Sequence, residues 1–280
     1  IEFRKAVAID CTIDEAFDTE INHPFKGNID LEKLENVLKN NPTENIPIIC
    51  VTVTCNSSGG QPISMQNLKD VHSLAQKYGI KILFDSARFA ENAYFIKIRE
   101  KGYENHTIKE IVKEMFQYAN YVTMSSKKVG IVNMGGFIAF DDEQVFKNAS
   151  LFNIMFEGYI TYGGMSGRDM NAVAQGLDEA TEFDYLETRI KQVEYLGNKL
   201  DAFGIHFQKP VGGHGIYVNA NHFFPNVPKD QYIAQTIVKN ADEKEFVGKN
   251  SVKAKEIGKT NSASIPKINN TNIQSPDRKS

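Results

Sequence analysis

The chain has 280 residues, 41% of them hydrophobic and 24% charged, so it is long and apolar enough to bury a substantial core. Its net charge of -3 at pH 7 provides no positive surface for nucleic acid or an anionic membrane, and no apolar run approaches the roughly 18 residues of a membrane span. We therefore expect a small-molecule partner, and neither a nucleic acid nor a membrane.

The first predicted unit is a strand followed by a loop and a helix. Residues 46–54 (IPIICVTVT) are almost all apolar and rich in β-branched side chains, which is typical of a strand covered on both faces. Asn56 and the turn-forming residues 57–62 come next. Ser64 then precedes apolar residues at helical spacing, and this pattern stops at Gly79.

Further strands and helices alternate along the chain. The pattern predicts strands at residues 80–84, 121–124 and 135–140, and helices at residues 90–99 and 108–118. This alternation indicates an α/β protein with a largely parallel, doubly wound sheet. Because ligands of such sheets bind at the carboxyl ends of the strands, we expect the site there.

The sequence predicts four regions. Residues 1–165 form a large domain that is incomplete at its amino end, and residues 166–200 form a connecting helical region. Residues 201–240 form part of a smaller α+β domain. Residues 241–280 are rich in Lys, Asn, Ser and Thr and cannot bury enough apolar surface to offset their ordering entropy, so we predict a disordered tail.

Cysteine usage and the first residue complete this outline. The three cysteines are odd in number and show no C-x-x-C spacing, so they predict neither a disulfide framework nor a zinc site. A reducing, cytoplasmic location is therefore expected. Because the chain opens on Ile1 rather than methionine, we expect a fragment or a processed product.

Asp85 and the pair Lys127-Lys128 are the first candidates for chemistry. An acid and an amine at neighbouring strand ends suit pyridoxal phosphate, which needs a Schiff-base lysine and an acid that keeps the pyridine nitrogen protonated. Taken alone, an Asp at a strand end is more often a cap, and paired lysines usually lie in solvent. Here the apolar residues 121–124 and 131–140 flank the lysines, so at least one amine is expected near the interior. His214, between glycines, is interpreted as a packed or partly exposed residue rather than a ligand.

Longer segments closely resemble the β-eliminating lyases, the family of tryptophanase and tyrosine phenol-lyase. They are residues 51–65 (VTVTCNSSGGQPISM), 85–97 (DSARFAENAYFIK), 124–128 (MSSKK), 133–136 (NMGG), 161–164 (TYGG) and 167–170 (GRDM). The resemblance runs from about residue 5 to about residue 235. It implies the α/β fold of the aspartate aminotransferase-like enzymes (fold type I), with a large domain that binds pyridoxal phosphate.

The resemblance also implies roles for individual residues. Lys128 matches the family's Schiff-base lysine, and Lys127 matches the neighbour that supports it by charge and hydrogen bonding. Asp85 matches the carboxylate on the pyridine nitrogen. Arg88 matches the arginine on the cofactor's phenolic oxygen, and Asn56 matches an asparagine that touches the same oxygen and the substrate carboxylate.

Two further residues match the surroundings of the cofactor. Ser125 matches a serine at its phosphate, and the main-chain carbonyl of Asn133 matches a ligand of the activating potassium ion. The chain departs from the family at Val129, where an Asp is usual, and residues 264–267 (SIPK) place a lysine where the family has an arginine for the substrate carboxylate. The family's phosphate-cradling loop precedes the first residue of this chain.

The implied reaction is β-elimination of an aromatic amino acid, from L-tryptophan to indole, pyruvate and ammonia. Residues 85–91 and 161–164 favour tryptophan, whereas residues 133–137 and 167–170 lean toward the alternative, a tyrosine phenol-lyase that yields phenol. An inactive remnant of the lyase fold is the other alternative. The resemblance implies a homotetramer for the full-length form.

Overall fold

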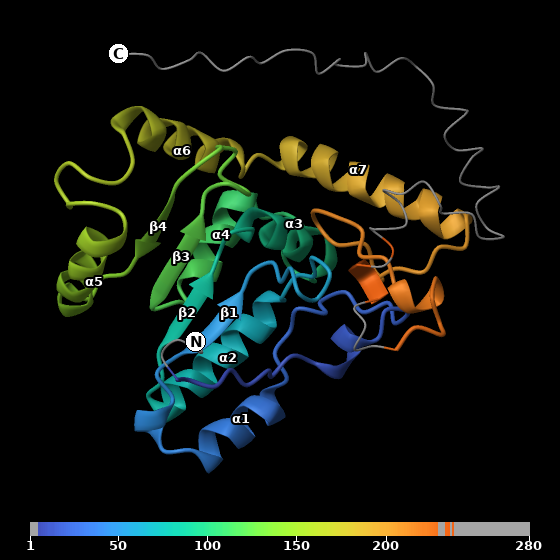
Figure 1. The fold of residues 1–280 in the computed structure, drawn as a ribbon, viewed down its shortest axis with the longest axis horizontal. Helices are drawn as coiled ribbons and strands as arrows, with labels where there is room; N and C mark the ends of the chain where they lie inside the picture. Colours follow the sequence, from blue (N-terminus) through green and yellow to red (C-terminus); the bar gives the residue numbers. More distant parts are fainter. Residues whose placement is uncertain (1–4, 229–232, 236, 238–280) are drawn as a thin grey trace, which may run out of the picture. The chain divides into compact units, whose positions relative to one another are not determined.

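The computed structural model describes residues 5–228, 233–235 and 237, and the chain divides into two compact units, Ile1–Asn219 and Ala220–Ser280. The first unit contains η2 (Asp14–Phe17), α1 (Leu31–Asn40), η3 (Thr43–Asn45), β1 (Ile49–Thr52), α2 (Met65–Tyr78), β2 (Ile82–Asp85), α3 (Phe89–Arg99), α4 (Ile108–Phe116), β3 (Tyr121–Ser125), β4 (Gly136–Ala139), α5 (Glu143–Phe156), α6 (Gly167–Glu179) and α7 (Phe183–Ala202) (Figure 1). The second unit contributes η4 (Ala220–His222). The predicted disordered tail and residues 264–267 lie outside the described residues.

The strands form one sheet in the order β1-β2-β3-β4, and the α/β class with a mostly parallel sheet is confirmed. β1, β2 and β3 are parallel, and Asp85 pairs with Thr52 on one side and Thr123 on the other. β4 runs antiparallel to β3, a reversal that the sequence pattern did not predict. Its cause is the short connection of residues 126–135, because a parallel neighbour needs a crossover of a dozen residues or more.

The capping residues explain why the predicted helices begin where they do. At α2, the Ser64 hydroxyl accepts a hydrogen bond from the Asn67 backbone at 3.1 Å, and Gly79 ends the helix with a φ of 69°. At α4, Thr107 and Glu110 form a reciprocal capping box. The predicted helices at these places are confirmed.

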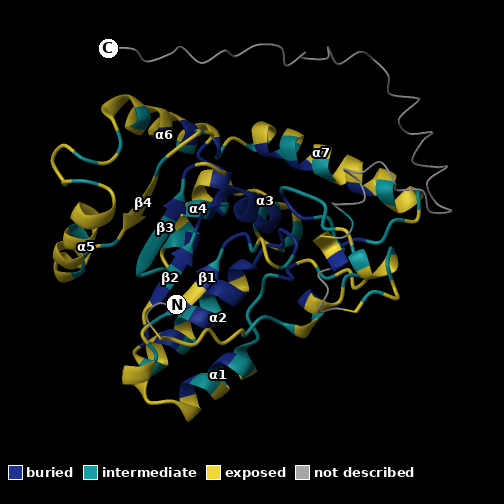
Figure 2. Cartoon of the chain, viewed as in Figure 1, coloured by how far each residue is buried: buried dark blue, intermediate teal, exposed yellow. Residues whose placement is uncertain are grey.

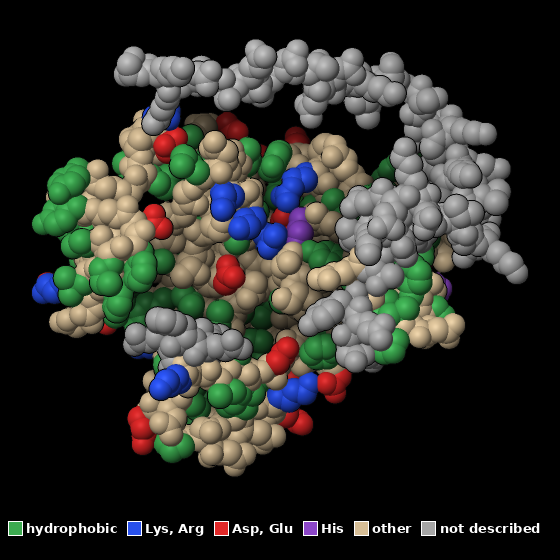
Figure 3. Space-filling view, viewed as in Figure 1, with side chains coloured by type: hydrophobic (Ala, Val, Ile, Leu, Met, Phe, Trp, Pro, Cys, Tyr) green, Lys and Arg blue, Asp and Glu red, His purple; other side chains and the backbone are tan. Residues whose placement is uncertain are grey.

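Two helices, α1 and α5, lie outside the predicted elements. α1 is capped by Asp30 and buries Leu34 and Leu38. α5 is capped by Asp142 but buries none of its residues. Hydrophobic side chains therefore gather at the left of the face in Figure 3, over α5. The large exposed apolar residues of α5 and β4 are Phe137, Ile138, Phe146, Leu151, Phe152, Ile154, Met155 and Phe156.

The core lies around α3, which packs against both α4 and α7. Figure 2 shows α3 dark blue along most of its length, and residues 89–96 are all buried. A helix that is buried on every side places its polar residues in the interior, where they require partners. Among the described residues, no helix has both the length and the apolar character needed to cross a membrane.

Candidate active site

The carboxyl ends of the three parallel strands bring together the residues chosen from the sequence. Asp85 is the last residue of β2, Ser125 is the last residue of β3, and Asn56 follows β1 by four residues. Lys128 lies just beyond β3, and its Nζ donates to Ser125 Oγ at 2.8 Å. The strand register therefore places an amine, a carboxylate, a hydroxyl and an amide at one edge of the sheet.

The segment that carries Lys128 is held against the turn that follows β2. The Val129 N–H donates to the Ala87 carbonyl at 3.3 Å, and the Val129 side chain is only 1% exposed, within the hydrophobic core. The Ser126 N–H donates to the Gly135 carbonyl at 3.1 Å. Burial of Val129 thus anchors the lysine segment at a position where the sequence departs from the family pattern.

Helix α6 approaches the same segment backbone to backbone. A Cβ atom built on Gly176 would collide with the carbonyl of Gly130, two residues after Lys128. Gly176 is itself buried. Only glycine permits this contact, so the position of α6 and the path of the lysine segment depend on each other.

Replacing Gly176 by alanine is expected to destabilise the protein by about 1–2 kcal/mol, because the overpacking cost exceeds the helix-propensity gain of roughly 1 kcal/mol. Urea unfolding followed by circular dichroism measures the change. Gly167→Ala is the matched control in the same helix, since a Cβ there meets nothing within 4 Å. Equal effects of the two substitutions would contradict the backbone contact.

Several polar groups at this edge have no strong partner among the described residues. Asp85 accepts one long hydrogen bond, from the Ala87 N–H at 3.5 Å, and forms no ion pair there. The Arg88 guanidinium has neither a hydrogen bond nor an ion pair within the described part of the chain. The buried hydroxyl of Ser126 is likewise without a hydrogen-bond partner. Buried or half-buried polar groups usually find partners, so this edge is suited to receive a ligand.

The groups at the edge fit pyridoxal phosphate in chemical kind. Lys128 offers a primary amine for the aldehyde, Asp85 offers a carboxylate for the pyridine nitrogen, and Arg88 offers a cation for the phenolic oxygen. Ser125 and Lys127 supply a hydroxyl and a second positive charge. Both lysines are exposed, so the expectation of an amine near the interior is wrong. These residues would hold the cofactor mainly at its ring and its aldehyde.

Asn56 belongs to a hydrogen-bonded network that includes residues near the carboxyl end of the first unit. Its Oδ1 accepts from the Tyr217 hydroxyl at 2.5 Å and lies 2.8 Å from His214 Nε2. His214 Nδ1 lies 2.8 Å from Glu91 Oε2, and Glu91 also forms an ion pair with Arg189 of α7. We call these five residues the Asn56 network. It fixes the Asn56 side chain.

The tyrosine of this network keeps its proton at neutral pH. Burial raises the pKa of the Tyr217 hydroxyl above its ordinary value of 10.0, while the positive charge of Arg88 acts in the opposite direction. The hydroxyl is therefore a donor toward Asn56.

Sequence reasoning missed the roles of His214, Glu91, Tyr217 and Arg189. His214 is largely buried, as expected, but both of its ring nitrogens contact residues at the site. The available signal was Glu91, a carboxylate inside the mostly apolar stretch of α3 at residues 89–96. A fully buried carboxylate requires a cationic or hydrogen-bonding partner, but its position alone does not identify that partner.

Replacing Glu91 by alanine is expected to destabilise the protein by about 2–3 kcal/mol, because Arg189 and His214 lose a shared carboxylate that is completely buried. Thermal and urea unfolding measure the loss. The control is Glu143→Ala, which removes an exposed ion pair with Lys147 and should cost about 0.5 kcal/mol or less. If both variants unfold like the parent, the network does not stabilise the fold.

The comparison with protein families identifies the relationship. The sequence matches the family model described as beta-eliminating lyase over residues 1–263. The chain belongs to the β-eliminating lyase family. This result confirms the resemblance seen in residues 85–97 and the other matching segments.

Individual relatives refine the comparison. A probable beta-eliminating lyase from Trichomonas vaginalis is 57% identical over 237 residues, which cover 85% of this chain and 52% of the relative. A tyrosine phenol-lyase from Clostridium tetani is 48% identical over 231 residues, covering 82% of this chain and 50% of the relative. This chain therefore spans about half the length of these curated relatives.

Solved structures give a more distant match. A threonine aldolase from Leishmania major is 14% identical, with a TM-score of 0.48 over 67% of this chain and 51% of that one.

Proposed function

We propose that this lyase chain contributes the ring-binding half of a site for pyridoxal-phosphate-dependent β-elimination of an aromatic L-amino acid, with L-tyrosine as the substrate. The observation that carries the proposal is the meeting of Asn56, Asp85 and Lys128 at the carboxyl ends of adjacent strands. Family membership supports the reaction class.

Lys128 and Asp85 would carry the main chemical roles. The bound cofactor supplies an electron sink for the substrate's α-carbon. Lys128 would hold the cofactor through Nζ and, once released by the substrate amine, would take the α-proton as general base. Asp85 would keep the pyridine nitrogen protonated by charge and hydrogen bonding. The contact from Ser125 Oγ orients the lysine amine toward this edge.

The Asn56 network would position the substrate. Asn56 would donate its amide N–H groups to the cofactor's phenolic oxygen and the substrate carboxylate, while its Oδ1 stays engaged by Tyr217. The guanidinium of Arg88 would add positive charge on the same side. The network would thereby fix the orientation of the amide.

The choice of tyrosine follows the relatives rather than residues 85–91. The sequence pattern favoured tryptophan, but several relatives that match this chain at 44–48% identity are named tyrosine phenol-lyase. L-Tryptophan is the second candidate, because residues 85–91 and 161–164 resemble the tryptophanase versions. We also propose a potassium ion at the Asn133 carbonyl, a homotetramer for the longer protein and a cytoplasmic location.

The test adds pyridoxal phosphate to the purified chain and records the near-visible absorbance spectrum. Phenol, indole and pyruvate are then assayed with L-tyrosine and L-tryptophan, in potassium and in sodium buffers. A lysine-dependent band with release of phenol and pyruvate supports the proposal. Indole without phenol would favour the tryptophanase alternative. The absence of any band would support the alternative of an inactive remnant. Val129, at a position where the family usually has Asp, favours that alternative.

A further inference from the structure

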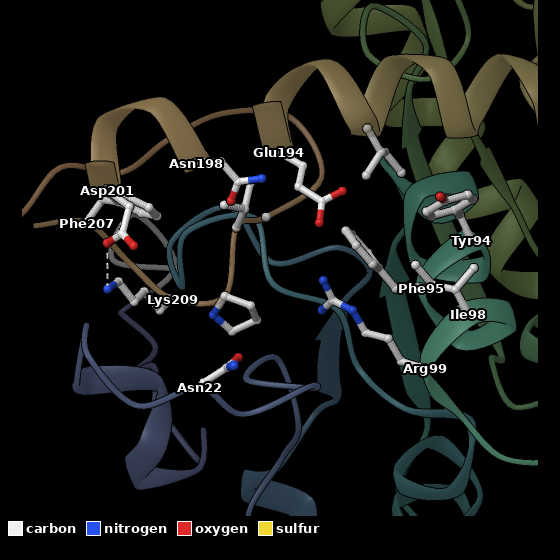
Figure 4. Close-up of a pocket in the computed structure, with 14 residues that line it drawn as sticks. Asn22, Tyr94, Phe95, Ile98, Arg99, Glu194, Asn198, Asp201, Phe207 and Lys209 are labelled. Carbon is white, nitrogen blue, oxygen red and sulfur yellow. Dashed lines mark ion pairs between the residues drawn. The ribbon is translucent and has the colours of Figure 1, made fainter. Parts of the chain in front are cut away.

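A second site is formed by a pocket between α3, α7 and residues 207–212 (Figure 4). The pocket encloses about 320 Å³, close to the lower end of the range of roughly 300–1,000 Å³ for small-molecule sites. Arg99, which lines it, ends α3, whereas Arg88 caps the start of that helix. Arg99 thus lies about one helix length, roughly 16 Å, from Arg88. Gly212, on the other side of the pocket, approaches the Gly59 carbonyl in the loop that carries Asn56.

Arg99 brings a poorly compensated positive charge to this pocket. Its Nη1 donates to the Pro24 carbonyl at 2.9 Å, and its guanidinium lies over the Phe95 ring at 3.9 Å. Burial lowers the pKa of Arg99 to about 10, so the group remains charged at neutral pH at a cost in desolvation. Among the described residues it has no carboxylate within ion-pair distance. Most of its five N–H donors are therefore available to an anion.

Glu194 supplies the opposite charge from α7. Figure 4 shows its carboxylate and the Arg99 guanidinium directed toward one another across the pocket. The charge of Glu194 favours the protonated form of Arg99, yet within the described part of the chain the two groups form no ion pair. The other acid and base in the pocket, Asp201 and Lys209, neutralise each other at 2.8 Å. One cation and one anion thus remain separated by a gap.

The lining between these charges is mixed. It includes the amides of Asn22 and Asn198 as well as Phe95, Ile190 and Phe207, whose side chains are almost fully buried. A small pocket with a separated cation and anion favours a small ligand that carries both charges. A phosphate or a dicarboxylate would be repelled by Glu194, and a simple amine would leave Arg99 without an anion.

We propose that this pocket binds a small α-amino acid in its zwitterionic form. The carboxylate is held by the guanidinium of Arg99 and the ammonium group by Glu194. A guanidinium presents paired donors that match a carboxylate in a bidentate arrangement. The proposal does not depend on the reaction at the strand ends, because it uses none of those residues.

The test titrates L-leucine into the cofactor-free, 280-residue chain by isothermal calorimetry. Two analogues isolate the charged groups: 4-methylpentanoate lacks the amine, and 3-methylbutylamine lacks the carboxylate. Saturable binding of L-leucine is expected, with each analogue at least about tenfold weaker. Lys128→Ala should bind L-leucine as the parent does, which separates this pocket from the candidate active site.

Two substitutions examine the residues themselves. Arg99→Met is expected to weaken L-leucine binding by about tenfold or more, and circular dichroism verifies that the variant is folded. Glu194→Gln alters an exposed side chain and should leave the fold intact. This substitution is expected to weaken the binding of L-leucine by about five- to tenfold. The binding of 4-methylpentanoate should stay unchanged or become tighter.

Three results would overturn the proposal. The first is the absence of saturable L-leucine binding. The second is equal affinity for L-leucine and 4-methylpentanoate, which would indicate a simple anion site. The third is an affinity for L-leucine that Glu194→Gln leaves unchanged, since the ammonium group would then have no partner in the pocket.

Discussion

Lys128→Ala is expected to abolish the absorbance band that pyridoxal phosphate gives with this chain and to lower lyase turnover by at least about a thousandfold. The band requires a covalent link to a primary amine, and the same amine is the proposed general base. Lys128 is the lysine whose Nζ is oriented at the strand ends, through its 2.8 Å hydrogen bond to Ser125. Absorbance spectra and single-turnover assays measure both effects.

Lys127→Ala is the matched control for this substitution. Lys127 is the adjacent residue and is equally exposed, but no contact with Ser125 orients it toward the edge. The band should persist in Lys127→Ala, although its position can shift because a nearby positive charge is lost. A band that survives in Lys128→Ala and disappears in Lys127→Ala would show that Lys127, and not Lys128, bonds the cofactor.

Asp85→Ala is expected to lower kcat/KM by roughly a hundred- to a thousandfold. Removing one partner of a buried ion pair costs about 3–5 kcal/mol, and each ~1.4 kcal/mol of lost transition-state stabilisation is tenfold in rate. The lower part of that range applies because Asp85 is half-buried rather than fully enclosed. Steady-state kinetics with saturating cofactor measure the loss.

The structure of the strand end should survive this substitution. Asp85 makes one long side-chain hydrogen bond to Ala87, and its backbone is paired on both sides by β1 and β3. The free energy of unfolding, measured in urea, should therefore remain within about 1 kcal/mol of that of the parent. Retention of full activity in Asp85→Ala would show that another group protonates the pyridine nitrogen.

Local signals were sufficient for much of the sheet and its helices. Ser64 and Gly79 delimit α2 through a side-chain cap and a left-handed backbone, both of which depend on nearby residues alone. β1 and β2 are short apolar runs that end at polar residues. The same reasoning located Asn56, Asp85 and Ser125 at one edge, because parallel strands align their carboxyl ends.

The remaining features depend on contacts that a single sequence does not display. The antiparallel direction of β4 follows from the length of its connection to β3. Helix α5 buries none of its residues, so its sequence shows no apolar stripe at helical spacing that would predict it. His214 reaches Asn56 across 158 positions of the chain. A pattern within a short window carries no information about a partner so distant.

The valine that follows Lys128 has a consequence for how the lysine segment responds to its surroundings. Attraction between charges weakens as ionic strength rises, whereas burial of an apolar side chain is maintained or strengthened by many salts. Val129, buried in the core and bonded through its N–H to Ala87, holds the segment by the second kind of force. The placement of the amine should therefore be nearly independent of salt, and any ionic-strength dependence of cofactor capture would report on Asp85, Arg88 and Lys127 instead.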